Sequence, residues 1–137
     1  MELRDAILGR KSVRAFKEEI PSIQTLEGLI HWAGRGPSAG AIRGFSAIIT
    51  KEKLFYDAPY HVAIFADIDK YYKRYGDRGR DLYAVQDATI FAAYLQLLLV
   101  EAELSSVWIG AFREDRVKAL FKTDLRPVAV LAVGFKA

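Results

Sequence analysis

The segment Leu82–Leu104 constrains the fold more than any other part of this chain. It is the longest stretch with helical spacing, and apolar residues lie on nearly every side of the expected helix. These residues are Val85, Ala88, Ile90, Phe91, Tyr94, Leu95, Leu97, Leu98 and Val100. A helix that is apolar all round is buried, either in a large core or between subunits. Because a chain of 137 residues has little volume to surround such a helix, the segment predicts a subunit interface.

Length and composition predict one folded domain over residues 1–137. The chain is 52% hydrophobic and 27% charged, which is outside the range of disordered proteins, and it contains no repeat or linker. It has no cysteine, which excludes disulfides, thiolate catalysis and Cys-ligated zinc or iron–sulfur clusters. We expect a cytoplasmic protein, since the first ten residues are charged and do not resemble a signal peptide.

The net charge of +3 is too small to predict binding to nucleic acid. Basic residues gather in two places, either of which could be a solvated face. One group is Arg10, Lys11 and Arg14, and the other is Lys70, Lys73, Arg74, Arg78 and Arg80. The longest apolar stretch is too short and interrupted to cross a bilayer, so we expect neither a nucleic-acid nor a membrane partner. His31 and His61 are isolated, and no metal site is expected.

The remaining patterns predict helices packed around a sheet, an α+β fold. Ser22 is a good N-cap for a helix, and Gly9 is suited to end a first helix in the left-handed conformation. The expected helices are Glu2–Leu8, a segment after Ser22, a short one within Asp67–Arg80, Leu82–Leu104 and Glu114–Phe121. The expected strands are Phe45–Thr50, Val62–Ala66, Ser106–Ile109 and Val128–Val133. The first two of these strands are apolar enough to be buried on both faces.

Four stretches, in order, resemble the FMN-dependent nitroreductase family. They are Gly9–Phe16 with its basic opening, Gly36–Ala41 (GPSAGA), Arg74–Gly79 followed by Gln86-Asp87-Ala88, and Trp108–Phe112 with the strand that ends at Gly134. The GPSAGA loop and the Tyr-Gly-x-Arg-Gly turn together look most like the branch that includes azoline-forming dehydrogenases of peptide maturation. Together the four stretches span almost the whole chain.

The resemblance implies a three-layer α/β/α sandwich with a mainly antiparallel sheet, assembled as an intertwined homodimer with FMN at the interface. It also implies an oxidoreductase that passes electrons from NAD(P)H to a small organic acceptor, such as a nitro compound or a quinone. The alternative is an FMN-binding relative without efficient turnover, which would act as a flavin carrier or sensor.

The basic opening suits the FMN phosphate, which carries about two negative charges. Arg is well suited to phosphate because its planar fork meets the oxygens in pairs. In an extended segment Arg10, Ser12 and Arg14 point the same way, and Lys11 adds a further cation. The resemblance assigns Arg10, Ser12 and Arg14 to the phosphate and ribityl chain. The alternative is an exposed basic cluster at a helix end.

Two further segments are assigned to the flavin by resemblance. Pro37, Ser38, Ala39 and Gly40 form a loop of small residues that would contact the flavin from the neighbouring subunit. A backbone N–H at Gly110 or Ala111 could hydrogen-bond flavin N5. The alternative for the loop is an ordinary turn between a helix and a strand. The alternative for Gly110 and Ala111 is a tight turn at the end of a strand.

Two departures from the family pattern limit the reaction. Ala41–Phe45 replaces the Asn that better-known nitroreductases place just after the loop, which argues against nitroaromatic reduction. Arg74 stands where the azoline-forming enzymes have a Lys suggested as the base, and Arg is a poor base, so azoline formation is not expected. Tyr75 is a candidate pocket residue or a half-buried structural Tyr. No catalytic side chain is expected, because the flavin carries the chemistry.

Overall fold

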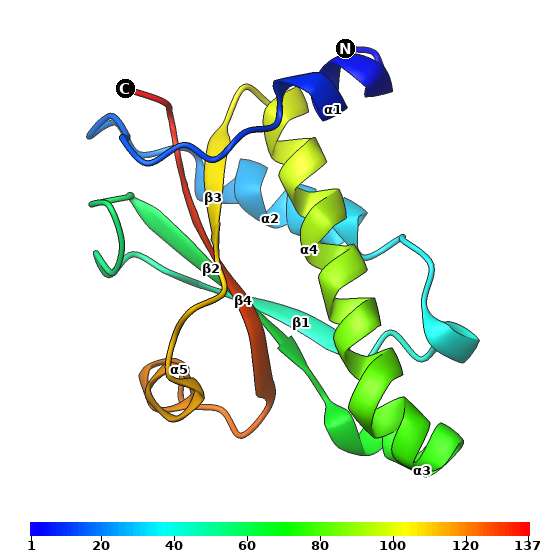
Figure 1. The fold of residues 1–137 in the computed structure, drawn as a ribbon. Helices are drawn as coiled ribbons and strands as arrows, with labels where there is room; N and C mark the ends of the chain where they lie inside the picture. Colours follow the sequence, from blue (N-terminus) through cyan, green and yellow to red (C-terminus); the bar gives the residue numbers. More distant parts are fainter.

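A four-stranded antiparallel sheet in the order β1-β2-β4-β3 forms the centre of the molecule (Figure 1). The computed structural model describes the whole chain, residues 1–137. The strands are β1 (Phe45–Thr50), β2 (Tyr60–Ala66), β3 (Ser105–Ile109) and β4 (Arg126–Gly134). All four expected strands are therefore confirmed, with β2, β3 and β4 longer than predicted.

Helices cover both faces of this sheet and produce the predicted three layers (Figure 1). The helices are α1 (Leu3–Gly9), α2 (Ile23–Ala33), α3 (Ile68–Arg78), α4 (Ala84–Glu101) and α5 (Glu114–Phe121). Side chains of β2 alternate between the layers: Val62 and Ile64 join the main core with α2 and α4, whereas Ala63 and Phe65 pack with Val117 of α5. The fold is the predicted α+β sandwich.

The two strands expected to be buried on both faces differ in the structure. Every residue of β2 is buried, as predicted for a central strand. The prediction was wrong for β1, whose six residues are all half-buried. The reason is topological, because β1 lies at the edge of the sheet and has a neighbouring strand on one side only.

The first helix ends differently from the expectation at Gly9. The helix continues through Gly9, and Arg10 N–H donates to the carbonyl of Ala6 at 3.0 Å. Arg10 then has extended backbone angles (φ −68°, ψ 125°), and Gly9 is not left-handed. A left-handed residue was not needed, because the chain leaves the helix directly into an extended segment that runs beside β3.

The segment between β2 and β3 is one long helical run rather than a helix and a separate turn. Gly76 (φ 64°, ψ −144°) interrupts α3, and the π-helical turn Gly79–Tyr83 joins it to α4. By length and composition the run Ile68–Glu101 could cross a bilayer. In this fold, however, α4 packs on the central sheet as a core helix.

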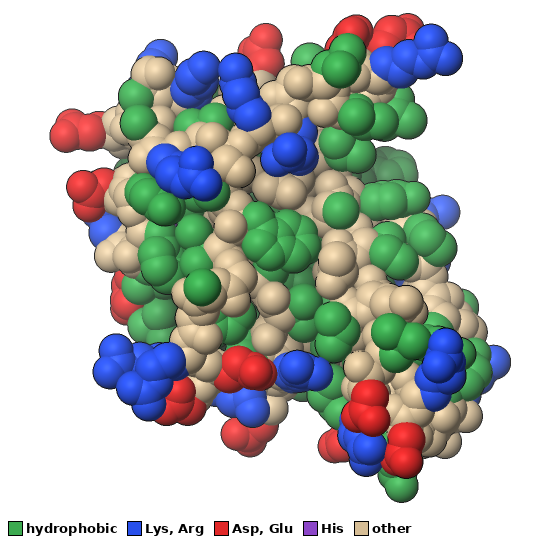
Figure 2. All heavy atoms as spheres, in the orientation of Figure 1, with side chains coloured by type: hydrophobic (Ala, Val, Ile, Leu, Met, Phe, Trp, Pro, Cys, Tyr) green, Lys and Arg blue, Asp and Glu red, His purple; other side chains and the backbone are tan.

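Only one side of α4 is covered by the rest of this chain. The buried side consists of Ala84, Asp87, Ala88, Phe91, Ala92, Leu95, Gln96 and Leu99. Apolar side chains on the other side are half-buried or exposed: Val85, Ile90, Ala93, Tyr94, Leu97 and Val100. Figure 2 shows hydrophobic side chains gathered along this part of the surface, over α1 and α4. The all-round apolar character of the helix is therefore not explained by the core of one chain.

Candidate functional site

The basic segment Arg10–Arg14 lies in extended conformation along β3. Val13 N–H donates to the carbonyl of Ser106 at 3.0 Å, and Ser12 forms a parallel bridge with the same strand residue. Val13 is buried, whereas Ser12 and Arg14 on either side of it are exposed. This alternation is what an extended segment produces, and it leaves the predicted phosphate-binding side chains on the solvent side.

The cations of this segment have no carboxylate partner within the chain. Arg10, Lys11 and Arg14 are exposed, and none takes part in a salt bridge or a side-chain hydrogen bond. Three other arginines are paired with acids: Arg80, Arg113 and Arg126. Arg10 and Lys11 line a hollow of about 190 Å³ that also includes Glu103, Ser105 and Ser106. Glu103 forms no salt bridge with either cation, so both cations remain suited to a phosphate group.

Gly110 and Ala111 follow the far end of the same strand and are exposed. At a rise of about 3.3 Å per residue, the four steps from Ser106 to Gly110 span roughly 13 Å. Gly110 lines a second hollow of about 210 Å³ together with Val85 of α4 and Pro127 of β4. Strand β3 therefore carries two of the three predicted parts of the site, one near each end.

The loop Pro37–Gly40 lies against α4 on the side away from the basic segment (Figure 1). With α4 and the turn before it, the loop forms a groove of about 630 Å³. The residues that line the groove are Pro37, Ser38, Ala39, Asp81, Leu82, Tyr83, Val85, Gln86, Asp87, Thr89 and Ile90. Val85 lines both this groove and the hollow at Gly110, whereas the hollow at Arg10 shares no residue with either. One chain thus brings the loop near Gly110 but not near the cations.

Asp87 of α4 anchors this loop. Its carboxylate accepts a 2.5 Å hydrogen bond from the Ser38 hydroxyl and 3.1 Å bonds from Ala39 N–H. It also accepts a 2.7 Å bond from the Tyr71 hydroxyl of α3. Asp87 is only 3% exposed, and a buried acid of this kind needs such donors because burial alone is costly.

Tyr71 is fully buried and connects α3 to the chain after the loop. Its hydroxyl accepts a 3.0 Å hydrogen bond from Gly44 N–H while donating to Asp87. Burial raises the pKa of Tyr71 above its usual value of 10.0, and the neighbouring Asp87 raises it further. The phenol therefore stays protonated and acts as a donor to Asp87.

Two arginines hold the carbonyl groups of the same loop. Arg43 donates to the carbonyls of Gly34 and Gly36, and its own N–H donates to the Ser38 hydroxyl at 2.8 Å. Arg74 of α3 donates to the carbonyl of Gly40 at 2.9 Å. These contacts fix the loop at both ends as well as at Asp87.

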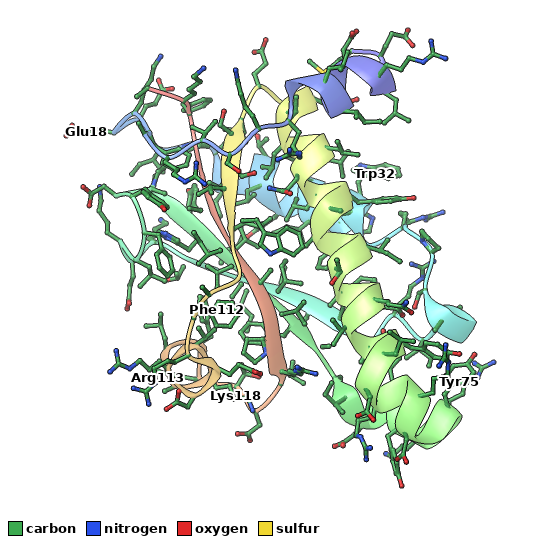
Figure 3. All side chains as sticks on the ribbon, in the orientation of Figure 1. Glu18, Trp32, Tyr75, Phe112, Arg113 and Lys118 are labelled. Carbon is green, nitrogen blue, oxygen red and sulfur yellow. The ribbon has the colours of Figure 1, made fainter.

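Tyr75 lies beside this loop and is partly exposed, at the end of α3 (Figure 3). Its ring packs edge-on against Tyr83 with centroids 5.1 Å apart, and Tyr83 lines the groove. A Cβ placed on Gly40, where φ is 53°, would lie only 2.5 Å from the Tyr75 hydroxyl oxygen. The positive φ of Gly40 disfavours a side chain there, and Tyr75 would have to shift to admit one.

Asp87, Tyr71 and Arg43 are not among the site residues predicted from the sequence. One signal was present for Asp87, because an acid on the otherwise apolar side of a core helix is rarely buried unless it is paired. No comparable signal identified Tyr71 or Arg43, since their partners are distant in the sequence or are backbone groups of a loop.

The two histidines do not belong to this site. His61 of β2 is buried, and Phe55 N–H donates to its Nε2 at 3.0 Å. Burial lowers the pKa of His61 below its usual value of 6.5. His31 is exposed on α2. No group of three or more potential metal ligands occurs in the structure.

A family model described as "Nitroreductase family" matches residues 49–135, which is more than half of the chain. No curated protein sequence matched this chain.

Several solved structures have the same fold. A nitroreductase family protein from Clostridium difficile is 26% identical with a TM-score of 0.88, and the match covers 100% of this chain and 86% of that one. One from Streptococcus pneumoniae is 17% identical with a TM-score of 0.91, covering 99% and 91%. Iodotyrosine deiodinase bound to FMN and 3-iodo-L-tyrosine is 20% identical with a TM-score of 0.83, covering 99% and 90%.

Proposed function

This chain belongs to the nitroreductase family, and we propose that it is a cytoplasmic, FMN-dependent oxidoreductase that passes electrons from NAD(P)H to a small organic acceptor. Two features of β3 carry the proposal. Cations without a salt-bridge partner lie beside the first residues of the strand, and two small, exposed residues, Gly110 and Ala111, follow its last residue. FMN has the same two ends, a phosphate and a flat ring. A structural relative with this fold, iodotyrosine deiodinase, binds FMN.

The residues at the phosphate end fit an anion. Arg10, Lys11 and Arg14 supply charge, and the exposed Ser12 hydroxyl supplies a further polar group. Bidentate contacts from Arg to phosphate are among the strong hydrogen bonds in proteins. We therefore propose that this segment holds the phosphate and ribityl chain.

The residues at the other end fit a ring. Gly110 and Ala111 have little or no side chain, so a planar group can approach their backbone closely. When bound, FMN supplies the redox chemistry, and the residues of this chain bind and orient it. We propose that a backbone N–H at Gly110 or Ala111 faces flavin N5.

A second copy of the chain would complete this site. Within one chain the loop Pro37–Gly40 does not reach the hollow at Arg10, and one side of α4 remains uncovered. Large apolar side chains are exposed nearby, including Leu8 of α1 (83%), Trp32 of α2 (61%) and Tyr94 of α4 (42%). We propose a homodimer through this surface, in which the loop of each subunit contacts the flavin bound by the other.

We propose no side-chain acid or base for the acceptor side of the site. Arg74 donates to the Gly40 carbonyl, and Arg is a poor base, so azoline formation is not proposed. Tyr75 packs against Tyr83, and Arg78 donates to the Tyr83 hydroxyl. Because Tyr83 lines the groove, we propose that both residues affect the choice of acceptor.

The absorption spectrum of the purified protein tests the proposal. A yellow protein that NAD(P)H bleaches under anaerobic conditions is the expected result. A protein that holds FMN but is not bleached would support the alternative, a flavin carrier or sensor. A colourless protein that also fails to bind added FMN would contradict both.

A further inference from the structure

We infer that Asp87 is a positioning residue that sets the backbone of the Pro37–Gly40 loop for flavin binding. This inference rests on the proposed function, because it concerns the same cofactor. It goes further by naming a buried residue on α4 that acts through the loop.

The donors around Asp87 come from two separate parts of the chain. Ser38 and Ala39 belong to the loop, and Tyr71 belongs to α3. The Tyr71 hydroxyl in turn accepts from Gly44 N–H, and the Ser38 hydroxyl accepts from Arg43 N–H. One carboxylate therefore organises both the entrance and the exit of the loop.

These bonds also decide what the loop can offer to a ligand. The Ser38 hydroxyl donates its single proton to Asp87 and accepts a bond from Arg43, so only one lone pair remains. The Ala39 N–H is likewise directed to Asp87. The loop would thus contact a flavin through Pro37, the Ala39 methyl group and the Gly40 backbone rather than through the Ser38 hydroxyl.

The backbone after the loop needs this support. Gly40 (φ 53°), Ala41 (φ 56°) and Arg43 (φ 50°) are in the left-handed region, which is unfavourable for the last two. Such conformations persist only where surrounding contacts determine them, and they occur often at ligand-binding loops. Asp87, Arg43 and Arg74 provide those contacts.

The test compares Asp87→Asn, Ser38→Ala and Ser38→Thr with the wild-type protein by FMN titration. Asn places an NH₂ group where donors already converge, so we expect FMN affinity to fall at least about tenfold, as for the loss of a hydrogen bond to a charged group. Ser38→Ala should weaken affinity less. Ser38→Thr should restore it, because Thr keeps the hydroxyl and fits the extended backbone at this position (φ −142°, ψ 140°).

Leu95→Ala is the matched control for a merely structural effect. Leu95 is a buried residue of the same helix and belongs to the main core rather than to the loop. The Leu95→Ala substitution should lower the unfolding temperature without changing FMN affinity. Amide hydrogen exchange should become faster at Ala39 and Arg43 in Asp87→Asn, while β2 amides remain protected.

The outcomes separate the inference from the proposed function. If wild-type protein binds no FMN, both fail. If Arg14→Ala weakens FMN binding and Asp87→Asn does not, the inference alone is wrong. Loss of affinity in Leu95→Ala as large as in Asp87→Asn would also overturn it. If the Asp87→Asn variant does not fold, the FMN affinities of Ser38→Ala and Ser38→Thr test the inference in its place. Equal affinity in these two variants would overturn it.

Discussion

The hydroxyl of Tyr71 lies 2.7 Å from Oδ2 of Asp87, and this contact joins the end of the β2–α3 connection to the core helix. Both residues are buried, and the phenol is held between a carboxylate and the N–H of Gly44. The pair belongs to a polar network that joins α3, α4 and the loop before β1.

Tyr71→Phe should destabilise the protein by about 1–3 kcal/mol, because Gly44 N–H loses its acceptor in a buried place. The raised pKa of Tyr71 adds a pH effect. Its stabilising contribution is complete below the usual tyrosine pKa of 10.0 and is lost as pH rises toward the raised value. Urea unfolding at neutral and alkaline pH measures the destabilisation and its pH dependence, with a Tyr72→Phe change at an exposed position as control. If the Tyr71→Phe variant lost as much free energy of unfolding at alkaline pH as the wild-type protein, Tyr71 would not be the titrating group.

Arg10→Ala and Arg14→Ala should each weaken FMN binding by about tenfold to a hundredfold without lowering the free energy of unfolding. A charge-assisted hydrogen bond contributes roughly 1.5–3 kcal/mol, and neither arginine has a partner within the chain whose loss would destabilise it. Lys118→Ala removes a cation on α5, away from the Arg10–Arg14 segment, and should leave affinity unchanged (Figure 3). Unchanged affinity in both arginine variants would refute the phosphate site.

The protein should sediment as a dimer at micromolar concentration, with an interface above about 2,000 Å² in total. Tyr94→Glu should shift it toward monomer, because it places a charge on the uncovered side of α4. Glu18→Ala, at an exposed position near the N-terminal end, serves as the control (Figure 3). A stable, folded wild-type monomer would exclude the proposed assembly.

Flavin reduction should not depend on any single polar side chain outside the FMN-binding segments. Stopped-flow reduction by NAD(P)H should be nearly unchanged in Tyr75→Phe and Arg78→Ala, which instead should alter the KM for the acceptor. Ala111→Leu should slow reduction, because a larger side chain would enter the place proposed for the ring. A thousandfold loss in Tyr75→Phe, about 4 kcal/mol of barrier, would show that a protein proton donor is essential.

Much of the fold could be predicted because hydrophobic periodicity and capping act locally. Ser22 accepts a hydrogen bond from Thr25 N–H as an N-cap should, and α5 has the predicted bounds. The half-burial of β1 could not be predicted, since it depends on the order of strands in the sheet. The straight exit from α1 at Gly9 likewise depends on the pairing of the following segment with β3.

The candidate site was less predictable than the fold. The alternation of Ser12, Val13 and Arg14 follows from extended backbone, but the anchoring of Ser38 by Asp87 joins residues 49 positions apart. Periodicity does not identify such partners. From the sequence alone, Ser38 is a candidate ligand of the flavin. In the structure its hydroxyl donates to Asp87 and accepts from Arg43 N–H.

Helix α4 carries the buried Asp87 and the exposed Tyr94, which lie two turns apart on one rigid element. In the proposed dimer, anything that rotates this helix changes the loop and the interface together. Cofactor occupancy and self-association would then be thermodynamically linked: FMN would favour the dimer, and dilution would release FMN. Flavin content measured at a single protein concentration would consequently describe that concentration alone.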